Sequence, residues 1–151
     1  MAYMAPDSCI TLREGLAEYF AQNDDLMEGS ELPSDLGVGL QSHDVAHVVF
    51  GCDTSFLGEA LLVRWSFFGV VGSIRPYLIG MQRQETRGLF IDAFAKFRLS
   101  MLWPLVKYAS IAVYRSLRMQ KRWPFEDYEP FLDKPLDEIR EQFGIRVLGA
   151  V

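Results

Sequence analysis

The sequence predicts an all-α fold, built as a single-domain helical bundle over residues 1–151. Apolar residues recur at spacings of three and four along several stretches, which is the period of an amphipathic helix. No stretch alternates polar and apolar residues over the length of a strand. Half of the 151 residues are hydrophobic, so one sizeable core can form.

Two helices are predicted in the first third of the chain. The first covers about residues 8–22, with Ser8 as its N-cap. Residues 23–39 follow as an acidic linker, because they are rich in glycine, serine and acidic side chains. The second helix covers about residues 39–50, and Gly51 ends it.

Three further helices are predicted in the remainder of the chain. One covers about residues 54–81, with Asp53 or Thr54 as its N-cap. A long helix covers about residues 86–120. A short last helix covers residues 136–143, since a proline precedes it and a glycine follows it.

Charge is distributed unevenly around a net value of −5. Residues 1–59 carry eleven acids and one base, residues 60–122 two acids and eleven bases, and residues 123–151 seven acids and three bases. The basic middle either pairs with the acidic ends or forms a surface that faces anions. Binding to nucleic acid is not expected, because the net charge is negative and no nucleic-acid-binding motif is present.

The chain has no features of a membrane-spanning or exported protein. No run reaches the roughly 18 apolar residues that a membrane helix needs. The first residues lack the pattern of a signal or transit peptide. Cys9 and Cys52 form no disulfide framework, which fits a reducing compartment. We therefore expect a cytoplasmic protein that can still lie on a membrane surface.

The segment from His43 to His47 carries the clearest chemical signal. It contains both histidines of the chain, four residues apart, with Asp44 beside the first. On a helix the two imidazoles lie about 40° apart around the axis, and Asp44 falls on the same side. Nitrogen and carboxylate ligands that converge in this way favour a divalent metal. The alternative is a helix face whose histidines are partly buried without a metal.

Glu59 is predicted to complete this metal site. In one unbroken helix Glu59 would lie roughly 160° away from His43. A turn at Gly51 would direct the next helix back, so that the metal clips a helix–turn–helix together. The ligand set suits Zn²⁺ first, then Fe²⁺ or Mn²⁺, and Mg²⁺ less well because it avoids imidazole. A metalloprotease is a poor interpretation, because Asp44 stands where those enzymes have glutamate.

Bulky apolar side chains are more numerous than a core of this size needs, with eleven phenylalanines and six methionines. They either fill the bundle core or line an apolar tunnel for a lipid. Arginines between them either contact an anionic lipid or membrane surface or pair with the acidic ends. The residues expected at a lipid are Phe67, Phe90, Phe94, Met101, Arg64 and Arg75.

These motifs resemble those of the coenzyme Q (ubiquinone) biosynthesis protein four family. The family's hallmark, His-Asp-x-x-His-x11-Glu, matches His43, Asp44, His47 and Glu59. Gly51-x-Asp53-Thr54 and Gly58-Glu59-Ala60 are also similar to the family, as is the closing segment over residues 135–145.

The resemblance implies an all-α metalloprotein of ubiquinone or prenylquinone biosynthesis, with His43, Asp44, His47 and Glu59 as metal ligands. It implies binding of a prenylated quinone precursor or another isoprenoid lipid. It further implies either oxidative decarboxylation of the quinone head group or a non-catalytic scaffold for other quinone-biosynthesis proteins. A bacterial homologue, peripheral to the inner membrane, is the expected form; the oligomeric state is left open, with a homodimer as one candidate.

Overall fold

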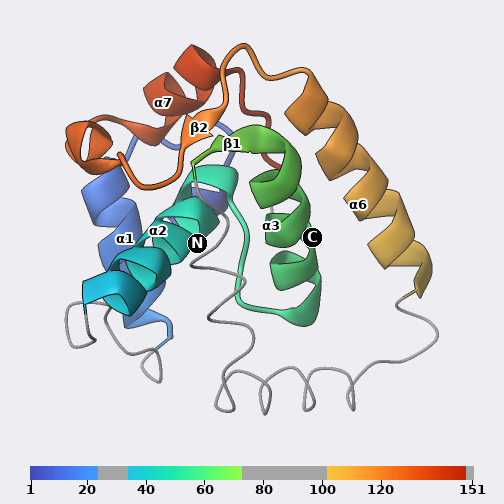
Figure 1. The fold of residues 1–151 in the computed structure, drawn as a ribbon, viewed down its shortest axis with the longest axis horizontal. Coiled ribbons are helices and arrows are strands. Elements are labelled where there is room, and N and C mark those ends of the chain that lie inside the picture. Colours follow the sequence, from blue (N-terminus) through green and yellow to red (C-terminus); the bar gives the residue numbers. More distant parts are fainter. Residues whose placement is uncertain (24–33, 73–101, 149–151) are drawn as a thin grey trace.

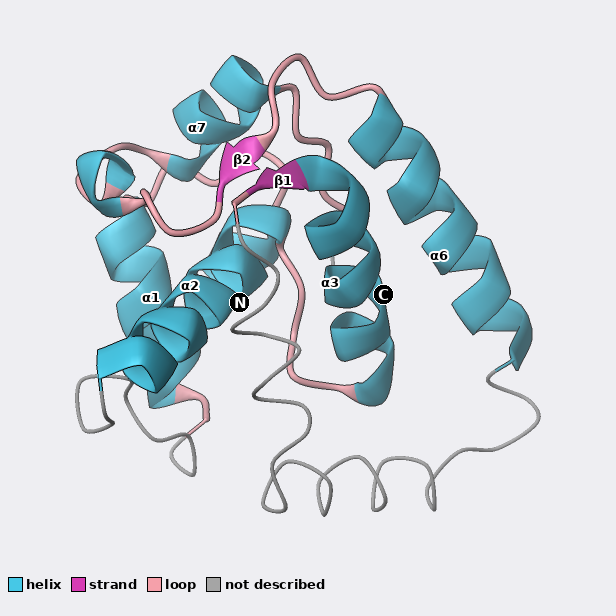
Figure 2. Cartoon of the chain, in the orientation of Figure 1, coloured by secondary structure: helices cyan, strands magenta, loops and turns pink. Residues whose placement is uncertain are grey.

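The computed structural model describes residues 1–23, 34–72 and 102–148, and it is mostly helical (Figure 1). The helices α1, α2, α3 and α6 lie in this order across the molecule, and α7 packs on α2. Figure 2 shows that the strands are confined to one short pair. The elements are η1 (Ala2–Met4), α1 (Leu12–Ala21), α2 (Ser34–Phe50), α3 (Phe56–Gly69), β1 (Val70–Val71), α6 (Leu102–Leu117), β2 (Trp123–Pro124), η4 (Glu129–Phe131) and α7 (Leu136–Phe143).

Helix α1 begins later than the sequence predicts, and its N-cap is Thr11 rather than Ser8. The Thr11 hydroxyl accepts from the backbone N–H of Glu14, and the Glu14 carboxylate accepts from the backbone N–H of Thr11. This capping box satisfies two backbone donors, whereas a serine alone satisfies one. Ser8 instead lies before the helix, where its carbonyl accepts from the N–H of Asp137.

Helix α3 begins at Phe56, because Ser55 caps it through a hydrogen bond from the N–H of Gly58. The predicted caps, Asp53 and Thr54, are therefore wrong. Asp53 instead accepts from the backbone N–H and the hydroxyl of Ser55, and so holds the turn that precedes the cap.

The end of α3 also differs from the prediction, which extended it to residue 81. The helix ends at Gly69, and the next two residues form β1, which pairs in parallel with β2. This ladder was not predicted, because strands of two residues are too short to show an alternating pattern. Within the described residues, the fold is thus helical with one small parallel sheet.

Other boundaries follow the sequence more closely. Helix α2 begins at Ser34, so the predicted linker over residues 23–39 is partly helical, and residues 24–33 lie outside the described chain. Helix α6 lies within the predicted range 86–120, of which residues 86–101 are not described. Helix α7 has the predicted bounds, and Gly144 ends it in the left-handed region at φ 70°.

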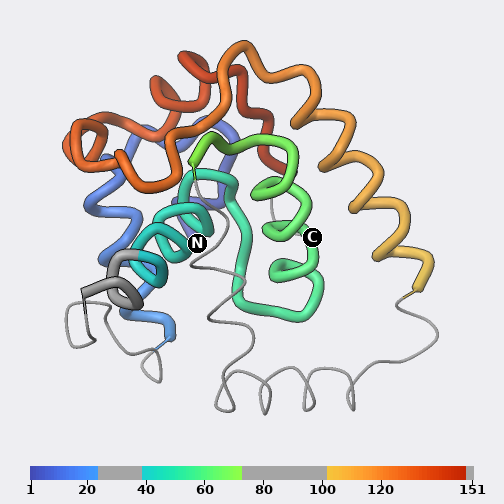
Figure 3. Tube along the Cα trace, viewed as in Figure 1, coloured from blue at the N-terminus to red at the C-terminus, as the bar shows by residue number. Residues whose placement is uncertain are grey.

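The two ends of the described chain are joined across the C-terminal end of α2. Figure 3 shows the blue N-terminal segment beside the red C-terminal part. The buried guanidinium of Arg140 donates to the carbonyls of Val48 and Val49 at 3.0 Å each, to Ala5 at 2.7 Å and to Tyr3 at 2.5 Å. Arg140 therefore satisfies carbonyls that the end of α2 leaves without helical partners.

Helix α2 lies in the core. Its residues from Val45 to Phe50 are all buried, with Trp65 of α3 stacked on Phe50 at 4.9 Å between ring centroids. A helix that is buried on most of its circumference must be apolar all round, and only its histidines and Asp44 depart from this over residues 43–50. None of the described helices combines the length and apolar content that a bilayer crossing requires.

Candidate metal centre

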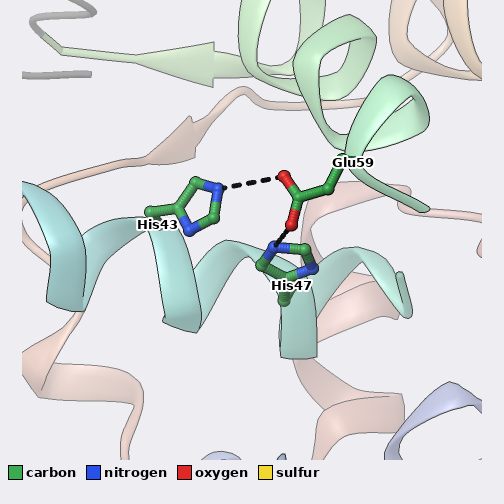
Figure 4. A group of neighbouring side chains, drawn as sticks. All are labelled: His43, His47 and Glu59. Atoms are coloured by element: carbon green, nitrogen blue, oxygen red, sulfur yellow. Dashed lines mark ion pairs between the residues drawn. The ribbon is translucent and has the colours of Figure 1, made fainter. Parts of the chain in front are cut away.

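Two histidines of α2 and one glutamate of α3 converge on one point (Figure 4). His43 and His47 are one helical turn apart, with ring centroids 4.6 Å from each other. Glu59, in the first turn of α3, directs its carboxylate between them. One ligand atom from each of the three residues lies within 4.8 Å of the other two. The convergence predicted for these three side chains is therefore present.

The carboxylate of Glu59 lies close to both imidazoles. In a tetrahedral site with bonds of about 2.0–2.1 Å, neighbouring ligand atoms are about 3.3 Å apart. The His47 Nε2 to Glu59 Oε1 distance is 3.1 Å, and the His43 Nε2 to Glu59 Oε2 distance is 3.5 Å. The two distances run to different oxygens of Glu59, so the carboxylate spans both rings at separations close to the tetrahedral value.

The hydrogen bonding of His47 leaves one nitrogen that needs a cation. Its Nδ1 lies 3.2 Å from the backbone carbonyl of Cys52, and a carbonyl only accepts, so Nδ1 carries the proton. The Nε2 atom is buried and has no hydrogen-bond partner, although Glu59 Oε1 lies 3.1 Å away. In the neutral ring, two lone pairs would face each other there. A proton or a metal ion between them removes this repulsion.

Asp44 lies on the other side of the His43 ring from Glu59. Its Oδ1 is 3.6 Å from His43 Nδ1, whereas Glu59 faces Nε2. The same Oδ1 accepts a hydrogen bond of 3.4 Å from the hydroxyl of Tyr19, whose ring stacks on His47. Asp44 is thus outside the group of three and is placed to orient His43, as carboxylates beside metal-bound histidines commonly do.

The site strongly perturbs the ionisation of its members. Burial lowers the pKa of His43, but the interactions with Asp44 and Glu59 outweigh it and raise that pKa to about 9. Burial raises the pKa of Glu59, but the interactions with His43 and His47 hold it well below its usual range. Burial and the neighbouring Asp44 raise the pKa of Tyr19, which therefore stays a hydrogen-bond donor. Without a metal, the centre is an imidazolium–carboxylate cluster.

The centre opens to solvent on the side of α3. The side chain of His47 is fully buried, that of His43 is 16% exposed, and that of Glu59 is 34% exposed. A ligand from solution would therefore approach beside Glu59. Two imidazoles and one carboxylate leave a fourth tetrahedral position for water or for such a ligand.

Two glycines shape the corner that brings α3 back to α2. Gly51 ends α2 in the left-handed region at φ 62°, which side chains other than glycine rarely adopt. A side-chain carbon on Gly58 would overlap the carbonyl and carboxylate of Asp53. Because Gly58 precedes Glu59, this close approach sets the position of the third ligand.

The residues predicted to contact a lipid are only partly described. Phe67 lies on the surface of α3, 54% exposed, and the half-buried Arg64 donates to the carbonyl of Ala60 at 3.5 Å. Among the described residues, a cavity of about 20 Å³ beside Cys52 has room for one water, whereas lipid-sized ligands need several hundred Å³. Arg75, Phe90, Phe94 and Met101 lie outside the described chain.

The sequence did not predict three supporting groups. These are the hydroxyl of Tyr19, the carbonyl of Cys52 and the guanidinium of Arg140. A backbone carbonyl leaves no trace in a sequence, and Tyr19 occurs 25 residues before its partner Asp44. Arg140 lies in the closing segment that resembles the family, and that resemblance is the one signal in the sequence that pointed to it.

Comparison of the chain with protein-family models, with curated proteins and with solved structures found no match.

Proposed function

We propose that this chain binds one divalent metal ion through His43, His47 and Glu59. The observation that supports this most directly is the buried Nε2 of His47, which faces a carboxylate oxygen at 3.1 Å without a hydrogen bond. The two nitrogens and one oxygen suit Zn²⁺, with Fe²⁺ and Mn²⁺ as alternatives and Mg²⁺ as the poorest fit. Asp44 orients His43 and raises its basicity.

The ligands come from two helices, so the ion would also stabilise the α2–α3 corner. Binding free energy at such a corner adds to folding free energy, because the unfolded chain has no preformed site. A bound ion would supply a Lewis acid at the open fourth position. The partly exposed side of Glu59 is where an anionic head group can reach it.

We further propose a role in prenylquinone metabolism, which rests on the resemblance of His43, Asp44, His47 and Glu59 to the coenzyme Q biosynthesis protein four family. In the catalytic version, the substrate is a prenylated aromatic acid whose carboxylate would lie at the open metal position. The ring carboxyl would leave as CO2, a hydroxyl from water would replace it, and O2 would accept the two electrons and become peroxide. Because Zn²⁺ has no redox chemistry, this version requires Fe²⁺ or Mn²⁺, or a substrate that itself passes electrons to O2. In the alternative version, the chain is a lipid-binding scaffold for quinone-biosynthesis enzymes at a membrane surface. An apolar tunnel for the prenyl tail belongs to both versions.

Metal content tests the first part of the proposal. Elemental analysis of purified protein should give about one metal ion per chain, and His47→Gln should abolish it. Glu59→Gln removes the carboxylate ligand and should lower the metal content. Glu126→Gln makes the same change at an exposed carboxylate far from the centre in the sequence, and it should leave the metal content unchanged. If wild-type protein does not compete with a chromophoric chelator for Zn²⁺ or Co²⁺, the proposed metal site is refuted.

Mass spectrometry under native conditions tests the lipid part. A co-purified polyisoprenoid lipid is expected, and its absence after expression in a quinone-producing host contradicts the prenyl-lipid proposal. Catalysis and scaffolding then separate through a folded, lipid-bound His47→Gln variant. Loss of quinone formation in that variant supports catalysis, and full retention supports the scaffold.

A further inference from the structure

Helix α6 carries large apolar side chains on its solvent side. Trp103 is 74% exposed, and the other four members are between 49% and 67% exposed. Isolated exposed apolar residues are ordinary on protein surfaces, but five on one helix are not. We call this set the outer face of α6; it consists of Leu102, Trp103, Val106, Tyr114 and Leu117.

These five residues lie on one side of α6, where the exposed Ser110 separates the first three from the last two. At about 100° per residue they fall within a sector of roughly 120° around the helix axis. The buried Ala112 and Ser116 lie outside this sector, and α6 packs against α3. Figure 1 shows α6 at the right edge of the molecule, with no described element on its outer side. The outer face is therefore unpartnered within the described chain.

Cations lie along one border of the outer face of α6. Lys107 follows Tyr114 around the helix by about 20°, and Arg118 comes directly after the last residue of α6. The guanidinium of Arg118 lies 4.8 Å from the centre of the Tyr114 ring, which holds it beside the apolar surface. Residues 102–125 contain five cations and no acid. An apolar face with a basic border and an exposed tryptophan is the pattern of a helix that lies in a membrane interface.

We propose that the outer face of α6 docks onto the surface of an anionic lipid bilayer. Trp103 and Tyr114 would lie at head-group level, Val106 and Leu117 would enter the acyl boundary, and Lys107 and Arg118 would contact lipid phosphates. A second copy of the chain fits this face less well. In a two-fold dimer the same cations would face each other, with no acid on the helix to pair with them.

This inference rests on the membrane role in the proposed function and assigns that role to α6. None of the residues of the outer face of α6 belongs to the metal centre. The two can therefore fail separately. Metal content is measured on the same samples, and each variant of α6 should keep the wild-type amount. Thermal unfolding confirms that each variant is folded.

The fluorescence of the three tryptophans provides a direct test. Trp65 and Trp123 are fully buried, so Trp103 is the one whose environment changes on docking. Wild-type emission should shift to the blue with vesicles of phosphatidylcholine that contain about a third phosphatidylglycerol, and much less with phosphatidylcholine alone. No shift at saturating anionic vesicles, or the same shift from protein concentration alone, would overturn the proposal.

Two pairs of variants locate the contact. Val106→Ser with Leu117→Ser keeps the reporter and should weaken vesicle binding by about tenfold or more. Phe68→Ser with Val71→Ser removes two other exposed apolar side chains that lie outside α6, and it should leave binding unchanged. Equal losses in both pairs, or no loss in the first, would contradict docking through α6.

The charge contribution is tested in the same way. Lys107→Gln with Arg118→Gln should weaken binding to anionic vesicles by about tenfold or more, and binding to neutral vesicles much less. Arg13→Gln with Lys134→Gln makes the same change in net charge on other elements and serves as the control. If sedimentation shows a dimer that the apolar α6 variants dissociate, this face binds a second copy and the membrane proposal is wrong.

Discussion

Lowering the pH should weaken metal binding far more steeply than an ordinary histidine site would allow. The perturbation acts on His43, whose pKa is raised from 6.5 to about 9 by Asp44 and Glu59. Because the metal must replace the proton on this ring, affinity falls wherever the ring is protonated. Glu59 does not add to the effect near neutral pH, since its pKa is held well below its usual range.

The expected magnitude follows from the two pKa values. With a pKa of about 9, the deprotonated fraction of His43 falls from about one in eleven at pH 8 to about one in a thousand at pH 6. The apparent dissociation constant should therefore rise about 90-fold over this range. A histidine at 6.5 would give about a fourfold rise over the same range.

Competition with a chromophoric chelator, corrected for the chelator's own protonation, measures this ratio for Zn²⁺ or Co²⁺. Calorimetry in buffers of different ionisation enthalpy should report close to one proton released per ion near neutral pH. Asp44→Asn removes the carboxylate beside Nδ1 and should make the pH dependence shallower. A wild-type ratio near fourfold would refute the raised pKa of His43 and the role of the two carboxylates in raising it.

Three further predictions concern stability. Arg140→Met should destabilise the fold by about 3–5 kcal/mol in chemical denaturation, because it leaves buried carbonyls unpaired, whereas the exposed Arg13→Met should cost less than about 0.5 kcal/mol. Gly58→Ala should lower the free energy of unfolding by about 1–3 kcal/mol and reduce metal occupancy, since the new methyl group overlaps Asp53. An unchanged melting temperature would contradict the geometry of this turn. The metal-free protein should lose stability as the pH rises through about 9, because the raised pKa of His43 stabilises the fold only while the ring is protonated. The loss in the free energy of unfolding should be at most about 3 kcal/mol. A stability that stays constant from pH 7 to about 10 would contradict this prediction.

Local signals in the sequence were sufficient for some elements of the fold. Helix α7 has its predicted bounds, because Pro135 and Gly144 are strong start and stop signals. The start of α1 was misplaced at Ser8, because the prediction overlooked Thr11, which has a glutamate three residues later and so forms a capping box. The end of α3 was misplaced for a different reason. It depends on pairing with β2, more than 50 residues away, and no local pattern encodes that contact.

The sequence also predicted only those parts of the candidate site that depend on local patterns. Helical periodicity and a glycine at the corner were enough to predict that His43, His47 and Glu59 meet. The sequence placed Asp44 with them as a ligand, because a helix puts it on the same side as His47. The structure places it behind the His43 ring instead, held by a hydrogen bond from Tyr19, and this contact between two helices cannot be read from spacing.

The bonds of Arg140 to the end of α2 have a consequence for the order of events during synthesis. All three residues of the centre lie within a stretch of 17 positions, which is synthesised before α7. Arg140, whose guanidinium donates to the C-terminal end of α2, is translated more than 90 residues after Val48, whose carbonyl accepts from it. Since domains fold as units while synthesis proceeds from the N-terminus, a nascent chain would expose histidines and carboxylate before their support exists. Stable loading with the proposed metal should therefore wait until α7 has been made.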